Sequence, residues 1–281
     1  MKLDIVVNKY LLIWHLLYQS SVSDDIHNLK QELWLEYKKE YSLVHGDKEE
    51  ILSLLDDFIP NDDLIYNLIE EAPQYKKIKQ ETNRYRNNIL EIWDQNRKIY
   101  TKELQQILKF TLKNTYKICV VHPNLDVVET DFKSNTITIG KKIITCDKDN
   151  FLTYLMYKIV KNEILKLKTS EKDILDVVVE LAITNELYTR ISKESKYKIG
   201  KKDLRELKEK IYPYWLMYLG VKEESFDKYM VRDNIFFDKT KYKYEKMLRT
   251  VDIYSFIAYL IKNKKSIFKT KLVPVENIEV L

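Results

Sequence analysis

Glycine and proline are so scarce in this chain that long helices with short connections are the expected fold. The 281 residues include four glycines and five prolines, the two residue types that most often interrupt helices and shape elaborate loops. The glycines, at positions 46, 140, 200 and 220, lie far apart. A glycine-rich phosphate loop needs several of them close together. The sequence therefore favours helices and argues against a Rossmann or P-loop nucleotide site.

Three blocks of different periodicity follow one another along the chain. The first, residues 1–115, reads as almost entirely helical, with Ser23 as a predicted N-cap and Asp47 with Glu50 as a capping-box variant. The segments "YKICVVHP", "LDVVETDF" and "NTITIGKKIIT" then predict one small sheet, because they are rich in β-branched residues. Helical patterns return after residue 150. We expect a predominantly α-helical α+β fold, with a helical region over 1–115 and a second region over 116–281.

Composition limits the function further. The chain carries 48 basic and 43 acidic residues, a milder excess than a dedicated nucleic-acid-binding domain shows. Its two cysteines, Cys119 and Cys146, do not make a disulfide framework and are typical of a reducing compartment. No run of about 20 apolar residues occurs, so no membrane-spanning helix is expected. We expect a cytoplasmic protein that does not enter a membrane.

One short stretch, "YKIVK" at 157–161, occupies a suggestive place in this order of elements. It lies on a helix predicted over 151–168, directly after the strand-like "NTITIGKKIIT". Residues 162–179, eighteen in all, separate Lys161 from Glu180, which lies on the next predicted helix. A strand, a helix and a second helix with a glutamate at this spacing form a plan known from one group of zinc enzymes.

Residues 116–192 resemble the gluzincin metallopeptidases in this plan. Gluzincins carry His-Glu-x-x-His on the first helix, so that two histidines four residues apart bind one metal ion. The intervening glutamate is the general base, and the aminopeptidase type places the third ligand, a glutamate, after eighteen residues. A zincin-like core would follow from the resemblance, with Tyr157, Lys158, Lys161 and Glu180 as the remnant site.

Three of these four positions depart from the family pattern, and the departures exclude its chemistry. Tyr157 binds a metal only as a phenolate, and Lys158 reverses the charge of the general base. Lys161 places an ammonium where the dication should lie. We therefore expect no metal, no cofactor and no zinc peptidase activity. No Ser-His-Asp or Cys-His arrangement suggests another hydrolase.

Two interpretations of the remnant site remain open. In the first, Lys161 pairs with Glu180 below an edge strand from 135–145, and its ammonium replaces the charge of the metal. In the second, 151–168 is an ordinary amphipathic helix with Leu152, Leu155, Ile159 and Val160 inward. Lys158 and Lys161 are then solvated, and the position of Glu180 is accidental.

Other polar and aromatic residues near these helices have simpler expected roles. Glu186 and Arg190, four residues apart, predict an exposed ion pair, and Asn185 is expected at the surface. Pro213 predicts a kink or break in the helix over 201–219. The aromatic residues around it are expected to pack in the core.

Lysine-rich segments provide the alternative function. One lies near 193–210, and a second contains Lys262, Lys264, Lys265, Lys269 and Lys271. Such patches bind nucleic acid through phosphate contacts, although solvated helix ends explain them equally well. The leading expectation is a non-catalytic pseudopeptidase that binds a protein or peptide, through the remnant cleft or the N-terminal helices. The alternative is a helical nucleic-acid-binding or regulatory module.

Overall fold

The chain folds into two compact units that share a predominantly helical architecture. The structure is a computed structural model that describes residues 1–19, 23–112, 115–131, 134–141, 148–192, 202–244 and 251–268. The N-terminal unit comprises Met1–Lys98 and Lys113–Phe151, and the C-terminal unit comprises Ile99–Leu112 and Leu152–Leu281. Together they form a mainly α-helical α+β fold with one small sheet, as the sequence predicts.

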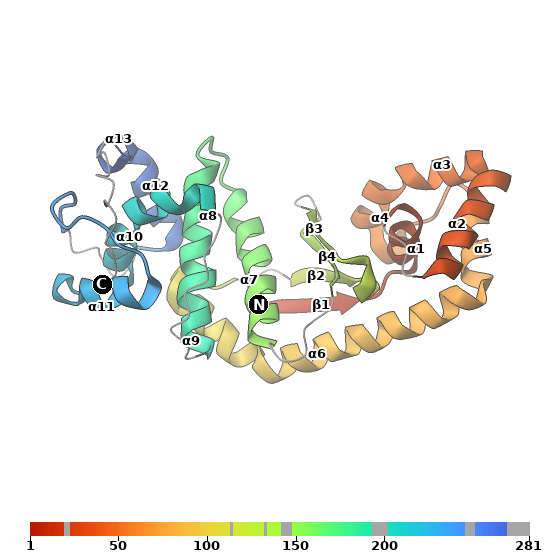
Figure 1. Ribbon diagram of the computed structural model, residues 1–281, viewed down its shortest axis with the longest axis horizontal. Coiled ribbons are helices and arrows are strands. Elements are labelled where there is room, and N and C mark those ends of the chain that lie inside the picture. Colours follow the sequence, from red (N-terminus) through yellow and green to blue (C-terminus); the bar gives the residue numbers. More distant parts are fainter. Residues whose placement is uncertain are drawn as a thin grey trace, which may run out of the picture. The chain divides into compact units, whose positions relative to one another are not determined.

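The N-terminal unit contains the sheet and most of the first six helices (Figure 1). In chain order its elements are β1 (Lys2–Val6), α1 (Lys9–Tyr18), α2 (Asp24–Glu36), α3 (Lys38–Gly46), α4 (Lys48–Leu54), the 3₁₀ turn η1 (Leu55–Asp57), α5 (Leu64–Glu71), α6 (Pro73–Leu108), β2 (Thr115–Val120), the 3₁₀ turn η2 (Pro123–Leu125), β3 (Val127–Asp131) and β4 (Thr136–Gly140). The long helix α6 continues into the C-terminal unit.

The sheet has the strand order β1-β2-β4-β3. Strands β1, β2 and β4 run parallel to one another, and β3 runs antiparallel to β4. Gly140 is required at the end of β4, because a Cβ atom there would lie 2.5 Å from the Val121 side chain and 2.8 Å from the His122 carbonyl oxygen. The strand order places β1 and β3 at the edges of the sheet, and β4 lies between β2 and β3. The prediction that the strand within 135–145 is an edge strand is therefore wrong.

Strand β1 differs from the prediction, because residues 1–115 were expected to be almost all helix. Leu3 and Ile5 alternate with exposed residues, as in a half-buried strand, and Lys2 to Val6 pair with Thr115 to Cys119. Because this pairing joins the chain start to the sheet, the sheet groups with the N-terminal helices. The structure thus divides the chain differently from the predicted boundary between residues 115 and 116.

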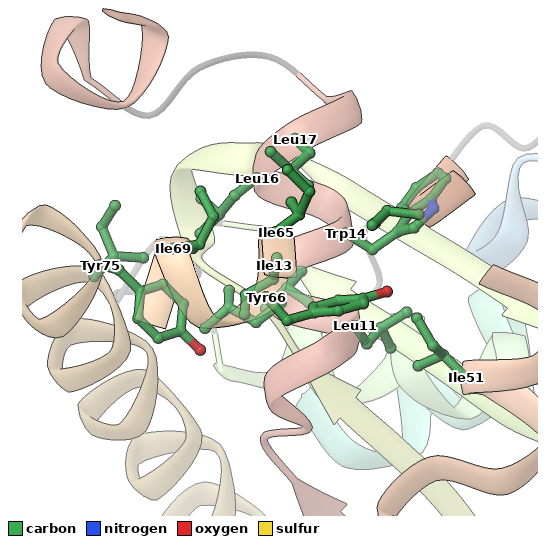
Figure 2. Packing of buried hydrophobic residues seen from close by; sticks show 14 of the residues in the cluster. Leu11, Ile13, Trp14, Leu16, Leu17, Ile51, Ile65, Tyr66, Ile69 and Tyr75 are labelled. Atoms are coloured by element: carbon green, nitrogen blue, oxygen red, sulfur yellow. The ribbon is translucent and has the colours of Figure 1, made fainter. Parts of the chain in front are cut away.

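The core of the N-terminal unit forms around α1, which is apolar on all sides. Figure 2 shows Leu11, Ile13 and Trp14 of this helix among side chains from α4, α5 and α6. Ile51 and Ile65 are buried in the same cluster. Burial of this many large apolar side chains is the main force that holds such a helix in place.

Helix caps explain where the first helices begin. The Asn8 side chain accepts a hydrogen bond from the Leu11 amide at 2.9 Å, and Ser23 accepts one from Ile26 at 3.3 Å, which confirms Ser23 as an N-cap. The predicted capping box at Asp47 is wrong, since Asp47 makes no cap hydrogen bond. Its carboxylate instead accepts the hydroxyl of Tyr66 at 2.9 Å.

The C-terminal unit contains helices and connecting turns, with no strand in its described part (Figure 1). Its elements are most of α7 (Lys148–Leu165), α8 (Lys172–Val179), the π-helical segment η3 (Glu180–Leu187), α9 (Tyr188–Ser192), the 3₁₀ turn η4 (Lys202–Leu204), α10 (Arg205–Leu219), the 3₁₀ turn η5 (Glu223–Ser225), α11 (Phe226–Asp233), α12 (Ile253–Lys262) and α13 (Lys264–Phe268).

Helix α10 supplies the aromatic centre of this unit. The rings of Trp215 and Tyr218 stack at 5.1 Å, and Tyr218 stacks on Phe256 at 4.8 Å. All three side chains are fully buried, and so is Tyr212, which confirms the predicted core packing for Tyr212, Trp215 and Tyr218. Tyr214 is half-buried. The helix continues without interruption across Pro213, so the predicted break does not occur.

Candidate functional site

Helix α7 carries the first three residues of the predicted remnant site. Leu152, Leu155, Ile159 and Val160 are buried, so the apolar face predicted for this helix is confirmed. Tyr157, Lys158 and Lys161 lie at its edge and are half-buried. The helix therefore presents polar groups beside a packed apolar face.

The fourth residue, Glu180, begins an unusual stretch of helix. The segments α8, η3 and α9 form one continuous helical run, with η3 in the wider π conformation. The Tyr188 amide donates to the Ile183 carbonyl five residues earlier, and Thr184 Oγ1 donates to the Glu180 carbonyl at 2.6 Å. Such π segments occur often at functional sites. Here the segment carries two buried carboxylates, Glu180 and Glu186.

The carboxylate of Glu180 is neutralised by Lys208 of α10. Nζ of Lys208 lies 3.1 Å from Oε2 of Glu180, and the two side chains are 2% and 4% exposed. Burial lowers the pKa of Lys208, whereas the adjacent Glu180 carboxylate opposes this shift. The centre of the site is therefore an ion pair that is almost inaccessible to solvent.

Lys161 does not fill the role predicted for it. Its ammonium lies 2.7 Å from Asp176 Oδ1, one helical turn before Glu180, and these side chains are 24% and 13% exposed. Asp176 lies nearer the surface, where the Lys161 ammonium stays partly hydrated, while Lys208 already neutralises the deeper carboxylate. The prediction that Lys161 pairs with Glu180 is therefore wrong.

The protonation states of Tyr157 and Lys158 also differ from those that residues of a zinc site need. Burial raises the pKa of the Tyr157 phenol, and the negative charges of Asp176 and Glu180 raise it further. The phenol thus remains protonated at neutral pH and is a poor metal ligand. Burial lowers the pKa of Lys158, with a smaller contribution from Lys161, and its ammonium lies 5.4 Å from the centre of the Tyr154 ring.

A second charge cluster follows at the other end of the π segment. Glu186 accepts hydrogen bonds from Arg190 at 2.8 Å and from Arg232 at 2.7 Å. Arg232 also binds Asp233 at 2.7 Å, and Asp233 accepts the Tyr212 hydroxyl at 2.6 Å. The Glu186–Arg190 pair predicted from the sequence exists, but its carboxylate is only 5% exposed, so the expectation of a surface pair is wrong.

The interior between these clusters contains polar atoms that the sequence did not reveal. Asn185, expected at the surface, is 3% exposed. Within the described part of the chain, its Oδ1 and Nε1 of Trp215 have no hydrogen-bond partner. Buried groups of this kind usually bind ordered water.

The basic patches on which the alternative function depends are only partly described by the structure. Lys264 binds Glu171 at 2.5 Å, and Lys262 and Lys265 are exposed. Lys269, Lys271 and residues 193–201 lie outside the described residues.

The remaining titratable groups that the structure describes do not form a metal centre. Among the residues that the structure describes, no group of three or more His, Cys, Asp and Glu side chains is placed to hold an ion. His122 instead binds Glu81 at 3.0 Å. Over the same residues, no helix combines the length and the apolarity needed to cross a bilayer.

Lys208 is the site residue that sequence reasoning missed. It lies 28 residues after Glu180, so no local motif connects the two. A signal was nevertheless present, because Lys208, Ile211, Tyr212 and Trp215 have the spacing of one helix face. A lysine on an otherwise apolar stripe predicts a buried ammonium that needs a carboxylate partner.

Comparisons with protein-family models, with curated proteins and with solved structures gave no match for this chain.

Proposed function

We propose that the chain is a non-catalytic binding protein, a pseudopeptidase on a gluzincin-like scaffold, with a protein or peptide as its partner. The observation that carries the proposal is the buried pair of Glu180 and Lys208 at 3.1 Å. An ammonium here provides the positive charge that zinc provides to the third ligand of a gluzincin. The pair is nearly inaccessible to solvent, so it stabilises the helices and leaves no open coordination position.

The exposed apolar side chains of the N-terminal unit support the binding role. Six of the ten large hydrophobic residues that are exposed in the described chain fall between positions 34 and 64, namely Trp34, Leu35, Leu43, Leu54, Ile59 and Leu64. Exposed apolar surface in a folded protein often marks a contact with another protein. The N-terminal helices are thus the proposed contact surface.

The catalytic half of the proposal is tested with purified protein. Elemental analysis should find no stoichiometric zinc, and a mixed peptide library should remain uncleaved with or without added zinc. One equivalent of bound zinc, or cleavage that a chelator stops, would contradict the proposal.

The binding half is tested by selecting peptides from a displayed library on the immobilised protein. Leu35→Glu and Ile59→Glu should abolish binding of the selected peptides without unfolding the protein, because these residues are 80% and 81% exposed. Val231→Glu is the matched control, since Val231 is 73% exposed in the C-terminal unit. Failure to select any peptide, or equal loss in all three variants, would count against the proposed surface.

A further inference from the structure

A groove of about 590 Å³ lies in the N-terminal unit, between α4 and one face of the sheet. Its volume is within the range of small-molecule sites. The groove is lined by Glu49, Leu52, Ser53, Lys117, Asp131, Ser134 and Thr136. These residues provide three charges, three hydroxyl groups and one aliphatic side chain.

Strand register explains why the charged residues of the sheet share this groove. Lys117 of β2 is paired with Thr136 of β4, and Thr136 is paired with Asp131 of β3. Paired residues on adjacent strands point to the same face, and neighbouring strands are about 4.8 Å apart. Lys117 and Asp131 therefore flank Thr136 from opposite sides.

Thr136 provides an observation that points to a ligand. Its side chain is completely buried in the row between the two charges, yet Oγ1 has no hydrogen-bond partner among the described residues. A buried hydroxyl in this condition is unfavourable, so polar atoms without partners call for an explanation. A bound polar molecule over Thr136 would provide the missing hydrogen bond.

The charges on the two sides of Thr136 are opposite. Lys117 is exposed and forms no ion pair within the part of the chain that the structure describes. Asp131 is held in place by Ser134, whose amide and hydroxyl donate to Oδ2 at 2.8 Å and 2.5 Å. Glu49 adds a second carboxylate to the lining. The lining of the groove therefore offers groups of both charge signs to a ligand.

We propose that this groove binds a small zwitterion, a free aliphatic α-amino acid. Its carboxylate binds the Lys117 ammonium and accepts a hydrogen bond from Thr136, and its ammonium binds Asp131 and Glu49. Leu52 contacts the aliphatic side chain. This site is independent of the peptide-binding surface proposed above, and it shares no residue with that surface.

Calorimetric titration with L-leucine tests the site, with N-acetyl-L-leucine and L-leucinamide as ligands that each lack one charge. L-leucine should bind, and each blocked analogue should bind at least about tenfold more weakly, because each loses a charge-assisted hydrogen bond. Titration of the other common amino acids follows if leucine does not bind. Absence of binding for all of them at millimolar concentration, or equal binding of the blocked analogues, overturns the proposal.

Variants identify the groove as the place of binding. Lys117→Met should weaken L-leucine binding about tenfold and remove the discrimination against L-leucinamide, since the carboxylate loses its partner. Thr136→Val should weaken binding while the protein stays folded, because valine keeps the shape of threonine. Lys76→Met, an exposed lysine on α6, is the matched control and should bind normally. Unchanged binding in Lys117→Met contradicts the assignment.

Discussion

His15 in the N-terminal unit and Lys208 in the C-terminal unit are both buried basic side chains, but their surroundings differ. His15 is 0% exposed on the apolar helix α1, and neither ring nitrogen has a hydrogen-bond partner in the described structure. Lys208 is 2% exposed and lies against the carboxylate of Glu180. One unit thus buries a neutral base among hydrocarbons, and the other buries ionised groups in pairs.

The difference shows two solutions to the cost of burying a titratable group. Burial lowers the pKa of His15 to about 4, so the ring is neutral at physiological pH. Lysine has too high an intrinsic pKa to lose its proton as readily, so Lys208 needs an opposite charge. The N-terminal unit should therefore respond to acid, and the C-terminal unit should respond to the loss of a charge partner.

The largest effect is expected from Lys208→Met, which leaves the Glu180 carboxylate buried without its partner. The unfolding free energy of the C-terminal unit should fall by about 3–5 kcal/mol. Urea denaturation measures the loss, and hydrogen exchange should place it in α8 and α10 while the amides of α1 stay protected.

Lys210→Met is the control on the same helix. Lys210 pairs with Glu206, whose side chain is 64% exposed, so the loss should stay below about 1 kcal/mol. Equal losses in the two variants would show that the buried pair is unimportant.

Acid should destabilise the N-terminal unit through His15. The unfolded ring titrates near pH 6.5 and the folded ring near 4, so the unfolded state binds more protons between these values. Stability should fall by roughly 3 kcal/mol as the pH drops through this window, and it should level off below it. Burial causes the shift; Glu129 opposes it and Lys48 adds to it. Hydrogen exchange of α1 against pH measures the effect.

His15→Phe should remove this part of the pH dependence, because phenylalanine is apolar and does not titrate. His27→Gln is the control, since His27 is exposed and binds Gln31 at the surface. A pH profile of His15→Phe that matches the unaltered protein would contradict the contrast between the two units.

Arg232→Met should have an intermediate effect on the C-terminal unit. Arg232 binds both Glu186 and Asp233, but its side chain is 21% exposed, so water partly replaces the lost contacts. We expect a loss of about 2 kcal/mol by urea denaturation. A loss larger than that of Lys208→Met would place the main charge centre of the unit at Glu186.

The smallest effect is expected from Lys161→Met. The pair with Asp176 lies nearer to solvent than the Lys208 pair, so the unfolding free energy should change by less than about 1 kcal/mol. A loss of several kcal/mol would restore Lys161 as the counter-charge that the sequence suggested.

Local sequence patterns predicted helices and their caps better than they predicted contacts between segments far apart in the sequence. The N-cap at Ser23 and the buried face of α7 could be predicted, because both depend on residues a few positions apart. Strand β1 could not be predicted with the same ease. Its partner begins at Thr115, and its five residues lead directly into the apolar helix α1.

The candidate site shows the same limit. The spacing from Lys161 singled out Glu180, which is indeed a buried carboxylate. Which lysine neutralises it depends on the packing of α10 against η3, and the sequence does not encode that contact locally. The burial of Asn185 and Glu186 also depends on the π segment, for which the sequence carries no clear signal.

A double-mutant cycle between Glu180 and Lys208 tests the central claim most directly. The unfolding free energies of Glu180→Gln, Lys208→Met and the double variant give the coupling energy of the pair. We predict a favourable coupling of at least about 2 kcal/mol, and a coupling near zero in the parallel cycle between Glu180 and Lys161. Negligible coupling to Lys208, or a larger coupling to Lys161, would contradict the account.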